Sequence, residues 1–216
     1  MSRLLLIELD RFSIIASNTA TVSAVVVVAA TTALASAQEP VGSTLDFSSA
    51  VLGPTTAFHT IERNSARLPF PLGVAIHGRA RRVLTTHFAG RKHVLLVAST
   101  TAGGFCTSLS GPYGGTTCPL SSRQIGRRTT LFPGLTSDAS GPILLNGYTT
   151  IARAARLRIT YRGGTAATVP FVWVDRPIDA GFFVYNLSAH RSFKNRAIQL
   201  TVYDRQERPL ARVVLR

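Results

Sequence analysis

Residues 155–174 read Ala155-Arg-Leu-Arg-Ile-Thr-Tyr-Arg-Gly-Gly-Thr-Ala-Ala-Thr-Val-Pro-Phe-Val-Trp-Val174 and predict a β-hairpin. Over the first eight residues, small or apolar side chains alternate with charged or polar ones, which is the period-two pattern of a strand with one solvated face. Gly163 and Gly164 supply the positive φ angles of a tight primed turn. The chain then returns as a partner strand over residues 165–174. Because Pro170 cannot donate a ladder hydrogen bond, we expect a bulge or a sheet edge there.

Further strand patterns flank this hairpin. Residues 81–88 and 93–99 are two apolar-rich runs separated by the Gly-containing turn 89–92, which predicts a second hairpin. The segment 121–140 lacks a pattern and is expected to be a loop-rich crossover. Short strands with turns every 8–12 residues or so are typical of an antiparallel sandwich or barrel. We therefore predict an all-β fold, an antiparallel β-sandwich, with later strands over residues 181–187, 196–204 and 209–215.

The first 37 residues have the order of an export signal. Arginines at positions 3 and 11 lie near the start, a Val-rich apolar run follows, and small residues precede the Gln-Glu-Pro at 38–40. Cleavage after Ala37 would release the protein, whereas retention would leave residues 12–37 as a single transmembrane helix, since such a helix needs about 20 mostly apolar residues. Both outcomes place the rest of the chain outside the cytoplasm, either secreted or anchored to the cell membrane.

The composition suits one basic domain after this segment. We expect a linker over residues 38–54 and a β-sandwich over residues 55–216, which is long enough for a sizeable core. The chain has 24 basic and 10 acidic residues, and its net charge is +14. Its arginines are scattered, which favours a soluble basic surface or attraction to anionic envelope polymers or lipid headgroups. Nucleic acid is not expected as a partner, because its binding sites usually cluster charge around an aromatic platform. The scattered arginines include Arg79, Arg81, Arg82, Arg127, Arg128, Arg153, Arg156, Arg205, Arg208 and Arg212.

The two cysteines predict a disulfide. Cys106 and Cys118 lie in the segment 103–119, where a Gly-Pro and a Gly-Gly pair bend the chain back on itself. An even number of cysteines in an exported protein is best explained by a disulfide. We do not expect a metal or other cofactor, because the intervening loop holds no His or acidic residue to complete a tetrahedral site.

One catalytic alternative uses Cys118 as a nucleophile. The order His59, Cys118, Arg127 resembles that of the sortase transpeptidases, which are extracytoplasmic β-barrel enzymes with an N-terminal anchor. The resemblance implies a Cys that attacks a peptide bond, a His that acts as acid and base, and an Arg that stabilises the oxyanion. This hypothesis and the disulfide exclude each other, because a nucleophile needs a free thiolate.

Other catalytic patterns are missing from the sequence. There is no Gly-x-Ser-x-Gly elbow, no Ser-x-x-Lys motif with its partner motifs and no His-Glu-x-x-His zinc helix. We therefore expect a protein without enzymatic activity. The aromatic runs 171–174 and 182–185 place alternate side chains on opposite faces of a strand. One set, with Trp173 among the candidates, either is covered by a loop or forms a binding face for a peptide or sugar.

The last third of the chain carries a family resemblance. An Arg-Gly-Gly turn at 162–164, a Val-Pro at 169–170, the run Asp-Ala-Gly-Phe-Phe-Val-Tyr at 179–185 and a final hairpin at Val-Tyr-Asp-Arg 202–205 stand in this order. Over residues 148–216 this resembles the immunoglobulin-like modules of uncharacterised exported proteins from high-GC bacteria, especially actinobacteria. The resemblance implies an immunoglobulin-like β-sandwich and carries no active residues.

These observations predict an exported or membrane-anchored β-sandwich module with an interaction or structural role at the cell envelope. Its expected partners are an anionic envelope polymer or an envelope protein, with the membrane added through residues 12–37 if that segment is not cleaved. Two alternatives stay open. One is a sortase-like transpeptidase that uses Cys118, and the other is a basic module whose function is to bind anionic envelope polymers.

Overall fold

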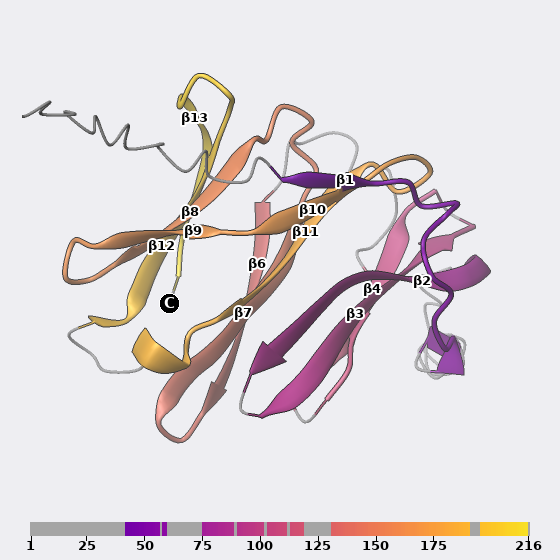
Figure 1. The fold of residues 1–216 in the computed structure, drawn as a ribbon, viewed down its shortest axis with the longest axis horizontal. Helices are drawn as coiled ribbons and strands as arrows, with labels where there is room; N and C mark the ends of the chain where they lie inside the picture. The colour runs from indigo at the N-terminus through magenta and orange to yellow at the C-terminus, as the bar shows by residue number, and fades with distance from the viewer. Residues whose placement is uncertain are drawn as a thin grey trace, which may run out of the picture. The chain divides into compact units, whose positions relative to one another are not determined.

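The computed structural model describes residues 42–56, 58–59, 75–88, 90–101, 103–111, 113–118, 131–190 and 195–215. In these residues the fold is all-β, as predicted, and its strands form three sheets (Figure 1). The export segment expected over residues 1–37 lies outside the described residues. Within the described part of the chain, no helix is both long and apolar enough to span a bilayer.

The five-stranded sheet, here called the central sheet, is antiparallel except at one edge. Its β1 strand pairs in parallel with β10, and the other neighbours are antiparallel. The strand order is β1 (Ser43–Leu45), β10 (Phe171–Val174), β11 (Ala180–Asn186), β7 (Gly141–Thr149) and β6 (Leu131–Asp138).

The other two sheets have four strands each and are antiparallel. A short 3-10 helix, Ser188–His190, follows β11. The C-terminal sheet has the order β13 (Pro209–Val214), β12 (Ala197–Tyr203), β8 (Arg156–Tyr161) and β9 (Ala166–Val169). The disulfide sheet has the order β2 (Ile76–Phe88), β3 (Arg91–Thr100), β4 (Phe105–Leu109) and β5 (Thr116–Thr117).

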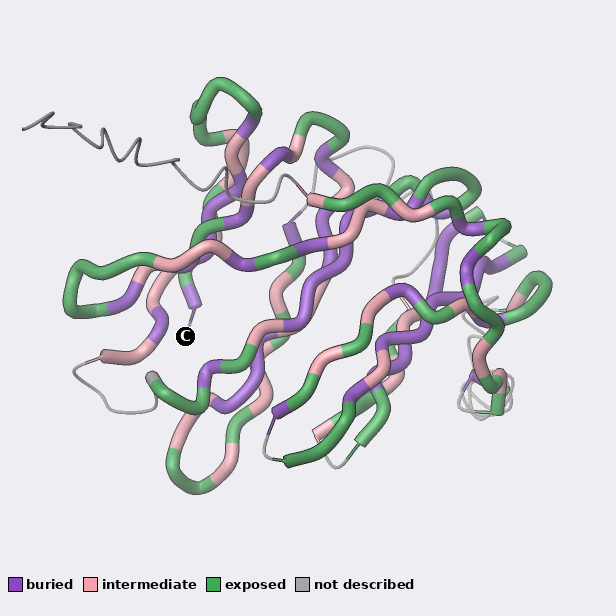
Figure 2. The backbone as a smooth tube through the Cα atoms, in the orientation of Figure 1, coloured by how far each residue is buried: buried purple, intermediate pink, exposed green. Residues whose placement is uncertain are grey.

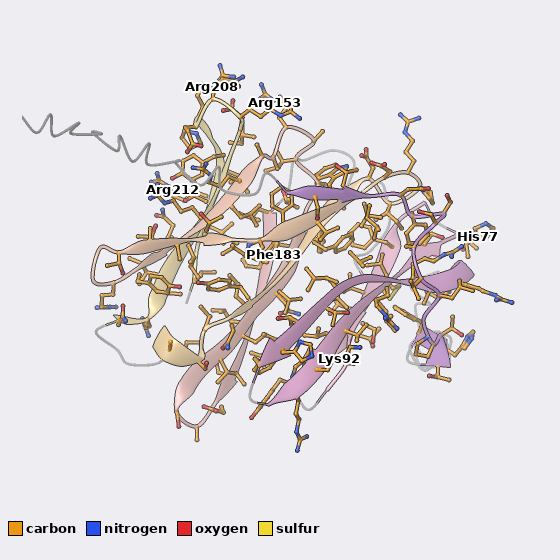
Figure 3. All side chains as sticks on the ribbon, viewed as in Figure 1. His77, Lys92, Arg153, Phe183, Arg208 and Arg212 are labelled. Carbon is orange, nitrogen blue, oxygen red and sulfur yellow. A yellow bond between two sulfur atoms is a disulfide. The ribbon has the colours of Figure 1, made fainter. Side chains whose placement is uncertain are left out.

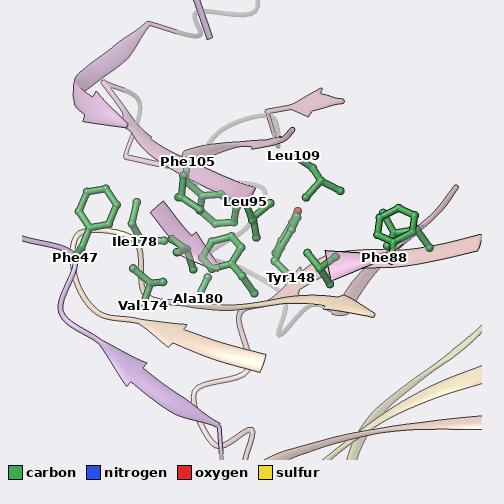
Figure 4. Packing of buried hydrophobic residues seen from close by; sticks show 14 of the residues in the cluster. Phe47, Phe88, Leu95, Phe105, Leu109, Tyr148, Val174, Ile178 and Ala180 are labelled. Atoms are coloured by element: carbon green, nitrogen blue, oxygen red, sulfur yellow. The ribbon is translucent and has the colours of Figure 1, made fainter. Parts of the chain in front are cut away.

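The central sheet is covered on both faces. On β11, Phe182 and Val184 pack in one hydrophobic cluster with side chains of β2, β3 and β4, as Figure 4 shows for that cluster. Phe183 belongs to a second cluster, with Leu157 and Leu200 of the C-terminal sheet. Figure 2 shows the resulting run of buried residues along β11 and β7. The expectation of one face covered by a loop is therefore wrong, because each face is covered by a sheet.

Both predicted hairpins are confirmed, but the return strand of the hairpin over residues 155–174 is divided. Residues Ala166–Val169 pair with β8 in the C-terminal sheet, whereas Phe171–Val174 pair with β11 in the central sheet. Pro170 lies between the two segments. Because proline has no N–H to continue the ladder, the chain leaves one sheet at Pro170 and enters the other.

Two segments without a sequence pattern contribute strands. The predicted linker 38–54 contains β1, and its Phe47 is buried in the core. Backbone hydrogen bonds of 2.9 Å and 2.8 Å also join this segment to β2, from Gly53 N–H to the Ala80 carbonyl and from Arg82 N–H to the Val51 carbonyl. The expected crossover 121–140 contains β6, and its residues 121–130 lie outside the described part.

Gly147 of β7 tests the close packing of the central sheet. It pairs with Pro133 of β6 and with Phe183 of β11. A Cβ atom at Gly147 would collide with the Phe132 carbonyl oxygen and would lie 2.9 Å from the Phe183 ring. We predict that Gly147→Ala lowers the free energy of unfolding by about 1–3 kcal/mol, as is usual for overpacking. Urea denaturation would measure this change.

The matched control for this substitution is Gly115→Ala. A Cβ atom at Gly115 would meet nothing within 4 Å, so its urea midpoint should stay close to that of the wild type. Equal midpoints for Gly147→Ala and the wild type would contradict the tight register of β6, β7 and β11.

Candidate functional site

A pocket of about 370 Å³ opens where the central and C-terminal sheets meet. The start of β1 and strand β10 form one side of it. The other side is formed by the β7–β8 connection, with Arg153, and by the β12–β13 turn, with Arg205 and Arg208. Figure 3 shows Arg153 and Arg208 at the same end of the molecule, whereas Lys92 lies at the opposite end. We call this the Arg153 pocket.

The floor of the Arg153 pocket is aromatic. Phe171 and Trp173 occupy alternate positions of β10 and therefore point to the same face of the sheet. Trp173 pairs with Gly181 across the strands. A Cβ atom at Gly181 would lie 2.9 Å from the Phe171 ring and 3.1 Å from the Trp173 ring. Both rings thus rest against the bare backbone at Gly181, with Phe171 buried and Trp173 half-buried.

A buried carboxylate organises the β12–β13 turn. One oxygen of Asp204 accepts hydrogen bonds from the backbone N–H groups of Gln206 and Arg208, both at 2.9 Å. The other oxygen accepts from Nε of Arg208 at 2.8 Å and pairs with Nη2 of the same guanidinium at 2.8 Å. Burial raises the pKa of Asp204, but the hydrogen bonds and the Arg208 charge outweigh burial and hold this pKa below its usual value.

The charge of the pocket is positive. Among the described residues that line the pocket, Asp204 is the one carboxylate, and it is already engaged by Arg208. Arg153 and Arg205 are exposed, and no carboxylate within the described residues forms an ion pair with either of them. Glu207 is paired with Arg156 at 2.8 Å and does not line the pocket. The pocket can therefore receive an anion on two unneutralised guanidinium groups.

The predicted cysteine pair is confirmed as a disulfide. Cys106 of β4 is bonded to Cys118, which follows β5, and the two Cα atoms are 4.1 Å apart. Cys106 is buried in a small cluster with Phe58, and Cys118 packs against this cluster. In this bonded state Cys118 has no thiolate to act as a nucleophile.

Of the two other members of the sortase-like set, the structure describes one. His59 is exposed next to Phe58, and Arg127 lies outside the described part of the chain. Among the described residues, no group of three His, Cys, Asp or Glu side chains could hold a metal ion. Comparisons with protein-family models, curated proteins and solved structures found no match to this chain.

No local sequence pattern brings the pocket residues together. Arg153 and Arg205 stand among many scattered arginines, and Trp173 stands in an apolar run. They are far apart in the chain and meet because two sheets pack together. The one part of the pocket with a recognisable sequence pattern is the turn that begins at Asp204, because Asp often accepts backbone hydrogen bonds in turns.

The lowered pKa of Asp204 predicts a specific pH dependence of stability. A carboxyl whose pKa is lower in the folded state stabilises the fold above its unfolded pKa, and this contribution is lost as the pH falls through the folded pKa. We expect Asp204→Asn to be less stable than the wild type at about pH 7 and to approach the stability of the wild type at about pH 2. Urea midpoints across this pH range would measure both effects.

A substitution at the exposed Asp175 controls for the loss of one negative charge. If Asp175→Asn changed the pH profile as much as Asp204→Asn, the profile would reflect net charge rather than the hydrogen bonds of the buried carboxylate.

Proposed function

We propose that this protein is an exported or membrane-anchored, non-enzymatic β-sandwich module that binds an anionic component of the cell envelope in the Arg153 pocket. The observation that carries the proposal is the pair Arg153 and Arg205, two exposed cations beside an aromatic floor with no carboxylate to neutralise them in the described residues. Arginine suits this role because its planar fork matches carboxylate and phosphate groups.

Two features support an extracytoplasmic location. The first 37 residues have the order of an export signal, either cleaved or retained as an anchor. The Cys106–Cys118 disulfide is the kind of bond that persists in oxidising compartments.

The lining of the pocket supports a binding role over a catalytic one. It contains no Ser, Cys or His among the described residues, and its single carboxylate, Asp204, has hydrogen bonds on both oxygens. The sortase-like alternative would need Cys118 as a thiolate, and the disulfide argues against it.

The strand order supports an immunoglobulin-like module over residues 131–215. If β6 to β13 are lettered A, B, C, C′, D, E, F and G, the central sheet without β1 has the order A-B-E-D and the C-terminal sheet has the order C′-C-F-G. These are the sheet memberships of the immunoglobulin fold. The pocket then lies between the B–C and F–G loops, which are positions that carry binding residues in immunoglobulin variable domains.

The binding proposal predicts that charge at the pocket matters more than charge elsewhere. We expect Arg153→Gln with Arg205→Gln to weaken binding to an anionic polymer about tenfold or more, because hydrogen bonds to charged groups contribute about 1.5–3 kcal/mol each. Isothermal titration with inorganic polyphosphate and with polygalacturonate would measure binding, with neutral dextran as the blank. Added salt should weaken it.

The matched control is Arg91→Gln with Lys92→Gln. This pair removes the same charge from the exposed start of β3, and Figure 3 shows Lys92 well apart from Arg153 and Arg208. If both double variants lost the same affinity, binding would reflect net charge alone, and the assignment of the pocket would be wrong.

The location is tested by intact mass spectrometry of the protein from its native envelope fraction, alkylated without reduction. We expect no alkylation of Cys106 or Cys118. The mass should be that of a polypeptide that begins at Gln38 or that of one that retains residues 1–37. The first mass indicates secretion and the second an anchor. Alkylation of both cysteines would contradict the disulfide and would return Cys118 to consideration as a nucleophile. Absence of the protein from both envelope and medium would contradict export.

A further inference from the structure

We propose that the anion bound in the Arg153 pocket is carried by a sugar, with its ring stacked on Trp173 and its charged substituent held by Arg153 and Arg205. This inference rests on the proposed function, which requires only an anion. The aromatic floor adds a second requirement, because a bare phosphate or carboxylate has nothing to place against an indole ring.

The position of Trp173 makes it suited to stacking. Its ring lies against Gly181 on the neighbouring strand, where a side chain would have displaced it. Trp173 is half-buried and lines the pocket. The C–H groups on one face of a pyranose ring carry slight positive charge, and they meet the negative face of an aromatic ring favourably.

The polar groups around the floor also suit a sugar. The Gln206 side-chain carbonyl accepts a hydrogen bond from Arg208 at 3.2 Å, which leaves the Gln206 amide N–H groups to donate. Thr44 adds a hydroxyl that both donates and accepts. Sugar hydroxyls need partners of both kinds.

Other ligand classes fit less well. A lipid chain would need an apolar pocket, whereas Arg153, Arg205 and Arg208 contribute charge to the lining of this one. Single-stranded nucleic acid is usually bound by several aromatic platforms along a basic groove, whereas Trp173 is the one half-exposed aromatic residue in the described part of the lining. A volume of about 370 Å³ is at the lower end of small-molecule sites and matches a short saccharide.

The chain offers a direct probe of this site, because Trp173 is its single tryptophan. Tryptophan emission, excited selectively over the five tyrosines, therefore reports on the surroundings of Trp173. We would titrate the protein with four ligands: galacturonate oligomers, neutral galactose oligomers of the same length, inorganic polyphosphate and single-stranded DNA. The first supplies ring and charge, the second a ring, the third charge, and the fourth bases with charge.

We expect galacturonate oligomers to shift the Trp173 emission in a saturable way. Neutral oligomers and polyphosphate should bind about tenfold more weakly or worse, because each lacks one of the two contacts. In calorimetry, Trp173→Phe should retain most of the affinity, since it keeps an aromatic face, whereas Trp173→Leu should lose about tenfold. Far-UV circular dichroism checks the fold of both variants, and the fluorescence titration of the wild type stands even if Trp173→Leu does not fold.

The outcomes separate this inference from the proposed function. If polyphosphate binds as tightly as galacturonate oligomers and leaves the emission unchanged, the assignment of a sugar ligand is wrong, whereas the proposed anion site is supported. If DNA binds most tightly and shifts the emission, the assignment of a sugar ligand is wrong and the ligand is a nucleic acid. If none of the anionic ligands binds, both the sugar and the proposed function are wrong.

Discussion

The central sheet is apolar on both faces, and the rest of the structure depends on this constraint. Consecutive residues of β11, Phe182 and Phe183, enter different hydrophobic clusters, so neither face can be left to solvent. Burying a side chain of this size contributes about 1.5–3 kcal/mol, and each face has several. The C-terminal sheet covers one face. Two sheets alone would leave Phe182 and Tyr148 exposed, which is why the chain needs the disulfide sheet on the other face.

The same arrangement creates the pocket. Pro170 ends the pairing of β9 with β8 and sends the chain into the central sheet as β10. Phe171 and Trp173 are thereby placed in the central sheet. They lie beside the two connections that contain Arg153 and Arg205. An unbroken strand over residues 165–174 would have kept these rings in the C-terminal sheet. A single residue that cannot donate a hydrogen bond thus links the sheet topology to the chemistry of the site.

Sequence reasoning succeeded where structure is local. The hairpin over 155–174 depends on period-two alternation and a glycine turn, and the hairpin over 81–99 depends on two apolar-rich runs around a glycine turn. The disulfide depends on a short loop, so each of the three could be predicted. Strands β6 and β7 were missed for opposite reasons. Pro133 and Gly134 interrupt the pattern of β6, whereas Ile143, Leu144 and Leu145 of β7 are all buried, so no alternation appears. The third layer and the Arg153 pocket depend on contacts between distant segments, which no local pattern records.

For the proposed binding in the Arg153 pocket, the buried Asp204 has a thermodynamic consequence. Its two oxygens hold backbone and side-chain groups of the β12–β13 turn before any ligand arrives. A turn that is already ordered loses little conformational entropy on association, so more of the contact energy remains as affinity. Such a site discriminates by fit rather than by remodelling, and its association rate is governed by encounter instead of loop closure.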